Sequence, residues 1–231
     1  MLGSNPAIWR GGECAPETAA LPSGFAALDA ALPGRGWPGA ALTEIALDHE
    51  GIGDIRLVLP ALVALQRDLA RTGRDVVWIA PPYQPYAPAL AAAGLDLSRL
   101  FIVRCASPQE ALWAYEQALR APECGAAFAW LGTADQRPLR RLAVAAREGR
   151  TFGVLWRRPG QHAQAVSAAL RLQLSPRQGL LAVRILKRRG SELPEALLLD
   201  IERTLPGLRA EVLVMPQAVP SPVFSAAAHA A

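Results

Sequence analysis

Cysteine, lysine and long apolar runs are scarce in this sequence, and each scarcity excludes a class of protein. The three cysteines (Cys14, Cys105 and Cys124) are odd in number and widely spaced, which argues against a disulfide framework and a zinc site. Lys187 is the only lysine, and the net charge of +4 is small for a dedicated DNA-binding domain. No apolar run approaches the roughly 18 residues that span a bilayer, and the N-terminus does not resemble a signal peptide. We therefore expect a cytoplasmic protein without a metal or cofactor.

Apolar residues make up 52% of the 231 residues, which is enough for the core of one large α/β domain. Residues 1–20 are rich in small residues, glycine and proline, and predict a flexible N-terminal arm. Residues 204–231 are rich in proline and alanine and predict a flexible tail. The core domain is expected over residues 21–203.

Strand-type and helix-type segments alternate through most of this domain. A first helix is expected over residues 21–32, with Ser23 as its N-cap. Strands are then expected over residues 40–47, 75–80, 100–104, 126–131 and 151–156, and helices over 54–71, 86–93, 108–120 and 137–148. The alternation predicts a mostly parallel sheet with helices on both faces. A weak helix over 161–169 and strands over 169–174, 180–188 and 195–202 predict an antiparallel C-terminal extension at one edge.

The turn after the first long strand is placed like a phosphate loop but lacks its chemistry. A phosphate loop needs glycines, a lysine for the phosphate charge and a serine or threonine for magnesium. Gly51 and Gly53 are present, but Asp54 and Ile55 stand where the lysine and hydroxyl residue belong. Asp54 instead suits the N-cap of the helix that follows, in which Pro60 predicts a kink or a later start. We expect no useful ATP affinity.

Three stretches resemble the core of RecA-type ATPases, in the order that they have there. Residues 21–57, LPSGFAALDAALPGRGWPGAALTEIALDHEGIGDIRL, resemble its opening helix, first strand and phosphate loop. Residues 76–120, VVWIAPPYQPYAPALAAAGLDLSRLFIVRCASPQEALWAYEQALR, resemble the second and third strands and the next helix. Residues 170–190, LRLQLSPRQGLLAVRILKRRG, resemble the hairpin that ends near DNA. The resemblance implies an α/β, RecA-like fold.

The catalytic positions that this resemblance implies hold other residues. A glutamate that activates water should follow the second strand, where this chain has Pro81 and Pro82. An aspartate for magnesium should end the strand at 126–131, where residues 130–132 are tryptophan, leucine and glycine and Asp135 lies too far along. The lysine that binds phosphate, the glutamate that activates water and the aspartate that binds magnesium are all missing. Their joint absence predicts a pseudo-ATPase and not an enzyme.

A small, arginine-rich chain of this kind resembles the ImuA family of translesion-synthesis proteins, which is related to the SulA cell-division inhibitors. The resemblance implies a non-catalytic adaptor of a mutasome in the bacterial SOS response to DNA damage. The implied partners are the Y-family-like polymerase homologue ImuB, RecA and an error-prone polymerase α subunit. A SulA-type inhibitor of a septum GTPase, a residual ATPase and a DNA-binding accessory remain open alternatives.

Two groups of basic residues and one aromatic residue are candidate contacts for DNA or a partner. Arg184, Lys187, Arg188 and Arg189 surround the end of the predicted hairpin, where they could follow a phosphate backbone or form a solvated turn. Arg157 and Arg158 follow the fifth strand, where open α/β sheets place ligands. Trp9, in the arm, is a candidate partner anchor. Trp78, Trp130 and Trp156 lie on buried-type strands and are expected in the core.

Overall fold

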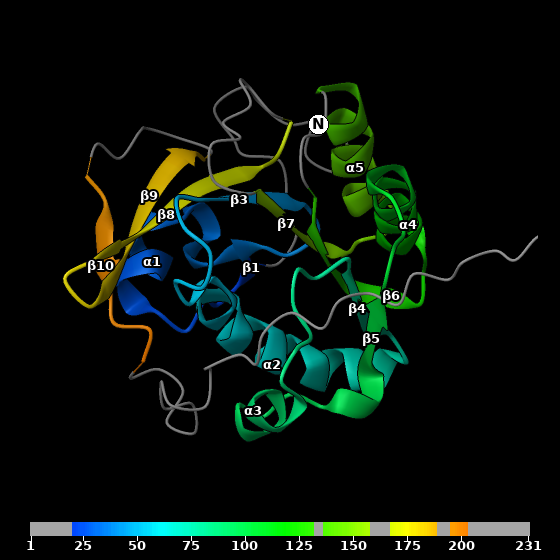
Figure 1. Cartoon of the computed structure of the whole chain (residues 1–231), viewed down its shortest axis with the longest axis horizontal. Coiled ribbons are helices and arrows are strands. Elements are labelled where there is room, and N and C mark those ends of the chain that lie inside the picture. The colour runs from blue at the N-terminus through cyan, green and yellow to red at the C-terminus, as the bar shows by residue number, and fades with distance from the viewer. Residues whose placement is uncertain (1–19, 132–135, 158–166, 189–194, 203–231) are drawn as a thin grey trace, which may run out of the picture.

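An eight-stranded sheet forms the centre of the molecule, shown in Figure 1. The structure is a computed structural model, and it describes residues 20–131, 136–157, 167–188 and 195–202. The strand order is β10-β9-β8-β3-β7-β6-β4-β5. The strands are β3 (Leu42–Leu47), β4 (Asp75–Ile79), β5 (Leu100–Val103), β6 (Cys124–Trp130), β7 (Phe152–Arg157), β8 (Leu170–Arg177), β9 (Leu180–Lys187) and β10 (Leu197–Leu199).

The sheet changes from parallel to antiparallel pairing at β8. Every pair from β8 to β5 is parallel, whereas β9 pairs antiparallel with β8, and β10 with β9. The predicted parallel sheet with an antiparallel C-terminal extension is therefore confirmed. Its centre is buried on both faces, which explains why strands such as β6, CGAAFAW, are continuously apolar or small.

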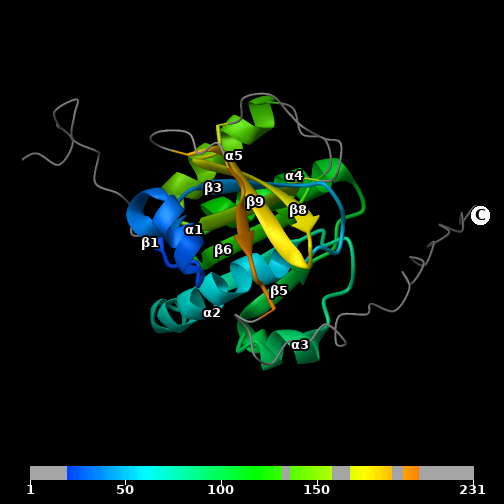
Figure 2. The ribbon, with the colours of Figure 1, turned by 90° about the vertical axis from the view of Figure 1, so that its left-hand side faces the viewer.

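Helices cover both faces of the sheet, and Figure 2 shows it between α4 and α5 above and α2 and α3 below. The helices are α1 (Ala26–Ala31), α2 (Asp54–Thr72), α3 (Ala87–Ala92), α4 (Pro108–Arg120) and α5 (Gln136–Glu148), with short 3-10 turns η1 (Pro33–Arg35) and η2 (Leu97–Arg99). Side chains of α1, α2 and α3 form one buried cluster with the sheet, and those of α4 and α5 form a second on its other face. No described helix is long and apolar enough to cross a membrane.

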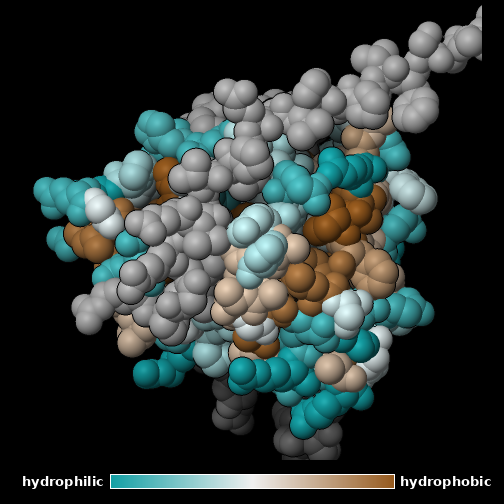
Figure 3. Space-filling view, turned by 60° about the horizontal axis from the view of Figure 1, so that its bottom comes forward, coloured by the Kyte–Doolittle hydropathy of each residue, from teal (hydrophilic) through white to brown (hydrophobic). Residues whose placement is uncertain are grey.

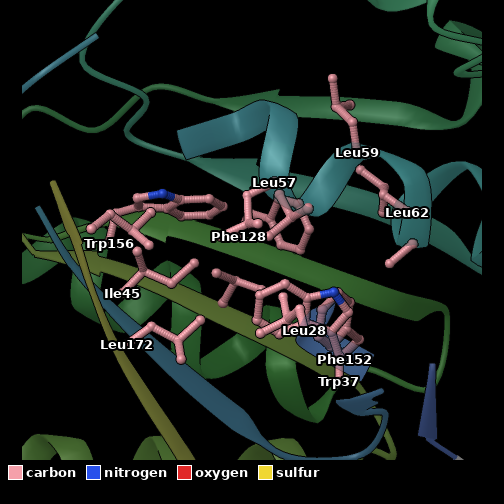
Figure 4. Close-up of a cluster of buried hydrophobic side chains, with 14 of the residues drawn as sticks. Leu28, Trp37, Ile45, Leu57, Leu59, Leu62, Phe128, Phe152, Trp156 and Leu172 are labelled. Atoms are coloured by element: carbon pink, nitrogen blue, oxygen red, sulfur yellow. The ribbon is translucent and has the colours of Figure 1, made fainter. Parts of the chain in front are cut away.

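The larger cluster fixes α2 against the sheet, as Figure 4 shows. Leu57 and Leu62 of α2 are fully buried and share this cluster with Ile45 and Phe128 of the sheet. Trp156 lies in the same cluster near the carboxyl end of β7. The position of α2 therefore places its first turn beside this end of the sheet, where the candidate site lies.

The start of α2 differs from the prediction in two respects. The helix begins at Asp54 and continues through Pro60 as one element, so of the two predicted effects of Pro60, a kink or a later start, the later start is wrong. The prediction that Asp54 is the N-cap is also wrong, because Gly53, at φ 85°, is the N-cap and no side chain caps the helix. Asp54 is the first helical residue, where its charge still favours the positive end of the helix dipole.

Two other segments differ from the expected elements. The first helix begins at Ala26 instead of residue 21, because Gly24 at φ 84° breaks the chain before it and Phe25 is the N-cap. Ser23 bonds with Phe25 in a local turn. Upstream, β1 (Ala20–Leu21) pairs with β2 (Trp37–Pro38), a contact that sequence reasoning missed. Most of the helix expected at 161–169 and both predicted terminal segments lie outside the described residues.

Candidate functional site at the carboxyl edge of the sheet

A cavity of about 650 Å³ lies at the carboxyl edge of the parallel strands, where open α/β sheets bind ligands. It lies between the turn from β3 to α2, the loop after β4, the ends of β6 and β7, the β8–β9 turn and residues 201–202. Its volume is within the range of small-molecule sites. Figure 3 shows the side of the molecule that carries α2 and α3, where hydrophobic surface gathers between hydrophilic residues.

Aromatic side chains form much of the cavity wall. Trp130 and Trp156 stack with ring centroids 4.6 Å apart and an interplanar angle of 8°, and Trp78 meets Trp130 edge to face at 5.6 Å. Tyr83 and Tyr86 also line the cavity and are 44% and 47% exposed, which places them at its mouth. The cavity therefore has a deep tryptophan wall and a solvent-exposed tyrosine rim.

Asp54 is a buried acid in this largely apolar setting. Burial raises the pKa of its carboxyl to about 6, and Glu50 adds to the rise, while the Asp54 backbone amide and the Trp156 indole oppose it. The Trp156 N–H lies close enough to lower the pKa but does not reach hydrogen-bonding geometry with any acceptor. Among the described residues, no basic side chain forms an ion pair with Asp54.

An apolar side chain of this chain lies directly against Gly53, in the turn between β3 and α2. A Cβ atom added to Gly53 would be 2.3 Å from Cδ1 of Ile201, a residue that belongs to the core cluster. The next residue, Glu202, pairs with the buried Arg56 of α2 at 3.7 Å. The segment after β10 therefore covers Gly53, while Gly51, at φ 74°, is exposed and Ile55 is partly buried.

The other positions that the RecA resemblance marks as catalytic lie at the same edge. Pro81 and Pro82 follow β4 and line the cavity, Trp130 ends β6, and Arg157 ends β7. Burial lowers the pKa of the Arg157 guanidinium, although nearby Glu44 opposes this change. Asp135 and Arg158 lie outside the described residues.

Glu44 forms a buried ion pair that sequence reasoning missed. Its Oε1 accepts from Nη2 of Arg171 at 3.1 Å, and the side chains are 1% and 13% exposed. The two residues are direct neighbours across β3 and β8, at the change from parallel to antiparallel pairing. Only the register of the sheet brings them together, because they are 127 positions apart in the sequence.

The predicted DNA-contact residues do not form one cluster. Arg184 and Lys187 are exposed on β9, opposite Gln173 and Arg171 of β8, and share one face of the hairpin. Arg188, in contrast, donates to the backbone oxygen of Ala31 at the end of α1. Arg189 and the predicted anchor Trp9 lie outside the described residues.

Sequence reasoning also missed the rim and cover of the cavity. It placed Trp78 and Trp156 in the core, which is confirmed because each is 1% exposed. It did not predict that these two side chains also line a cavity. The available signal for the rim was the stretch PPYQPY at 81–86, in which prolines end a buried strand and hold two tyrosines at its carboxyl end. Nothing in the sequence indicates that Ile201 reaches Gly53.

Comparisons with known proteins match part of this chain. A family model for the cell division inhibitor SulA matches residues 42–153. SulA of Edwardsiella piscicida is 33% identical over 101 residues, which cover 44% of this chain and 58% of that protein. Protein ImuA of Caulobacter vibrioides is 34% identical over 146 residues, which cover 62% of this chain and 59% of that protein.

A solved structure also aligns with part of the chain. The crystal structure of SulA from Pseudomonas aeruginosa matches with a TM-score of 0.44 and 25% identity, covering 52% of this chain and 98% of that one. The chain spans less than two thirds of the length of the curated relatives that it matches. The resemblance drawn from the sequence is confirmed: the chain is similar to ImuA and to SulA.

Proposed function

We propose that this chain is a RecA-like, non-catalytic adaptor of a translesion DNA synthesis complex in the bacterial DNA-damage response. It acts through protein–protein contacts with an ImuB-type polymerase homologue, with RecA and with an error-prone polymerase α subunit. The match to ImuA supports the pathway, and the order of parallel strands and helices supports descent from a RecA-type core.

The contact of Ile201 with Gly53 is the observation that carries the non-catalytic part of the proposal. An apolar side chain covers the turn that would have to receive phosphates, and Asp54 stands beside it in place of a lysine. A unit of like charge about 4 Å from a phosphate costs around 4 kcal/mol at an effective dielectric constant near 20. We therefore expect this turn to reject a triphosphate.

Calorimetric titration with ATP and magnesium tests this part directly. We expect no heat of binding at micromolar nucleotide and no hydrolysis above the buffer rate. Ile201→Ala is an informative companion, because it uncovers Gly53 but leaves the charge of Asp54, and it should also fail to bind. Micromolar affinity of the unaltered chain for magnesium-ATP would contradict the non-catalytic proposal.

Two exposed aromatic side chains on the α4 side support an adaptor role. Phe101 of β5 is 52% exposed, and Trp113 of α4 is 64% exposed. Large aromatic residues are preferred anchors of protein interfaces. We expect the purified chain to bind an ImuB-type polymerase homologue, and Trp113→Ala to weaken this binding at least tenfold.

Gln117→Ala is the matched control for Trp113, since Gln117 is also exposed on α4. Biolayer interferometry with the polymerase homologue, RecA and the polymerase α subunit as separate partners gives the affinities. Failure to bind all three would reject the adaptor proposal.

The SulA match favours a second candidate function, inhibition of a septum GTPase. It rests on the family model over residues 42–153 and on the relative from Edwardsiella. Expression of the chain in a growing bacterium separates the two functions. Filamentation together with direct binding to the septum GTPase would favour the inhibitor, and normal division with polymerase binding would favour the adaptor.

A further inference from the structure

The cavity combines aromatic walls with one buried carboxylate, a combination that the adaptor function does not use. Asp54 is 8% exposed and lines the cavity together with the stacked Trp130 and Trp156. We propose that this cavity binds a small planar aromatic cation, a protonated fused heteroaromatic ring with an amino group, whose N–H groups donate to Asp54. This site goes beyond the adaptor function and does not depend on it.

The walls suit a flat, apolar ring. The tryptophan pair presents aromatic surface inside the cavity, and Tyr83 and Tyr86 add aromatic surface at its mouth. Aromatic side chains attract both stacked rings and cations. A fused ring that binds in this cavity buries its apolar surface away from water. This burial supplies the apolar part of the affinity.

The charge of the cavity is unbalanced locally at Asp54. The charged residues that line it with Asp54 are Glu50, Arg56, Arg157, Arg177 and Glu202. Arg56 is paired with Glu202, and Arg157 is near Glu44. Glu50 accepts a hydrogen bond from the Tyr83 hydroxyl at 2.7 Å and lies close enough to Asp54 to raise the pKa of the Asp54 carboxyl.

A buried carboxylate without a cationic partner is costly, and a cationic ligand would remove that cost. Phosphates are disfavoured at the same place for the same reason. The proposal therefore requires a ligand that donates to Asp54 and carries positive charge, and it excludes anionic nucleotides as the natural occupant.

Binding should weaken in acid. The carboxyl of Asp54 must be ionised to hold the cation, and burial raises its pKa to about 6. A ligand whose ring remains protonated throughout should then bind tightly at pH 7.5 and progressively less tightly as the pH falls through about 6.

Isothermal titration of the full chain with 9-aminoacridine tests the proposal, because this dye is a planar cation across that pH range. Acridine is the matched probe, with the same ring system but no amino group and no charge at pH 7.5. A charge-assisted hydrogen bond in a buried site predicts about tenfold or greater preference for 9-aminoacridine. Equal affinity for the two probes, or no binding of either, would overturn the proposal.

Substitutions in the cavity test whether the cation of the ligand binds at Asp54. Asp54→Asn should lose the preference for 9-aminoacridine over acridine, as well as the acid-induced loss of binding. Asp68→Asn is the control, since Asp68 lies on the same helix but is exposed and paired with Arg71. Tyr86→Ala, at the half-exposed rim, should weaken both probes alike. A preference that survives in Asp54→Asn would contradict the assignment of the cation to Asp54.

Discussion

At the scale of the single residue, Asp54 combines two opposite effects. Its charge suits the first turn of α2, because the N-terminal end of a helix is positive. Burial removes the same charge from water, which raises the pKa of its carboxyl to about 6, although the Trp156 indole opposes part of this rise. The desolvation cost is the larger effect, so the ionised form destabilises the fold at neutral pH.

Asp54→Asn should therefore stabilise the protein at neutral pH. Because the pKa is higher in the folded state, the folded state binds the proton more tightly. The free energy of unfolding should fall as the pH rises from about 4 to about 6, by up to about 3 kcal/mol, and stay lower above. Urea unfolding at pH 4.5 and 7.5 measures this difference, which Asp54→Asn should lose and Asp68→Asn should keep. An equal pH response in both variants would show that Asp54 is not the cause.

The glycines of the degenerate loop offer a second test at this scale. Gly51→Ala and Gly53→Ala both place a side chain at positive φ, which costs about 1 kcal/mol or more. At Gly53 the new Cβ would also be 2.3 Å from Ile201, whereas at Gly51 nothing lies within 4 Å. Thermal unfolding should show the larger loss for Gly53→Ala, by about 1 to 3 kcal/mol. Ile201→Ala in the same chain should recover part of it, and equal losses at the two glycines would contradict the contact.

At the scale of elements, the junction of β3 and β8 joins the parallel and antiparallel parts of the sheet. The Glu44–Arg171 pair lies at this junction, and Oε2 of Glu44 has no hydrogen-bond partner within the described part of the chain. A buried ion pair contributes less to stability than its short N–O distance suggests, because both charged groups lose their hydration on folding. Replacing only one of the two residues leaves the charge of the other buried without its ion-pair partner.

Arg171→Met should consequently destabilise the protein by about 3 kcal/mol, since it leaves Glu44 buried without this partner. Adding Glu44→Gln should return a large part of the loss, because the uncompensated charge is then gone. Urea unfolding of the two single variants and the double variant measures the coupling. Additive losses would mean that the ion pair does not hold the junction.

At the scale of the whole molecule, the exposed cations Arg184 and Lys187 do not line the cavity. Arg184 and Lys187 lie on one face of the β8–β9 hairpin, whereas Arg188 is bound to the end of α1. Any affinity for double-stranded DNA should therefore depend on the first two residues and not on the third. Contacts with DNA and contacts with a ligand in the cavity would then use different residues.

The salt dependence of DNA binding checks this division. Neutralising Arg184 and Lys187 with glutamine should reduce the slope of log affinity against log salt by about 2, because two phosphate contacts are lost. Arg188→Gln should leave the slope unchanged and lower the melting temperature instead, since it removes a bond to Ala31. A slope that changes only in Arg188→Gln would reverse the assignment.

The sequence by itself determined the order of the main elements and the absence of a lysine and a hydroxyl residue directly after Gly53. Apolar runs such as AAFAW within β6, and the glycines and prolines that end such runs, are local features of the sequence. For this reason α4 and the antiparallel extension could be predicted. Asp54 could also be located from the sequence, because it directly follows Gly53.

The tertiary structure alone decided which distant residues meet. The contact of Ile201 with Gly53, the Glu44–Arg171 pair and the aromatic cavity join segments that are far apart in the chain. The register of the strands and the return of the chain after β10 set these contacts, and no local pattern specifies them. Side-chain burial, and with it the pKa of Asp54, follows from that packing because desolvation depends on everything that surrounds the group.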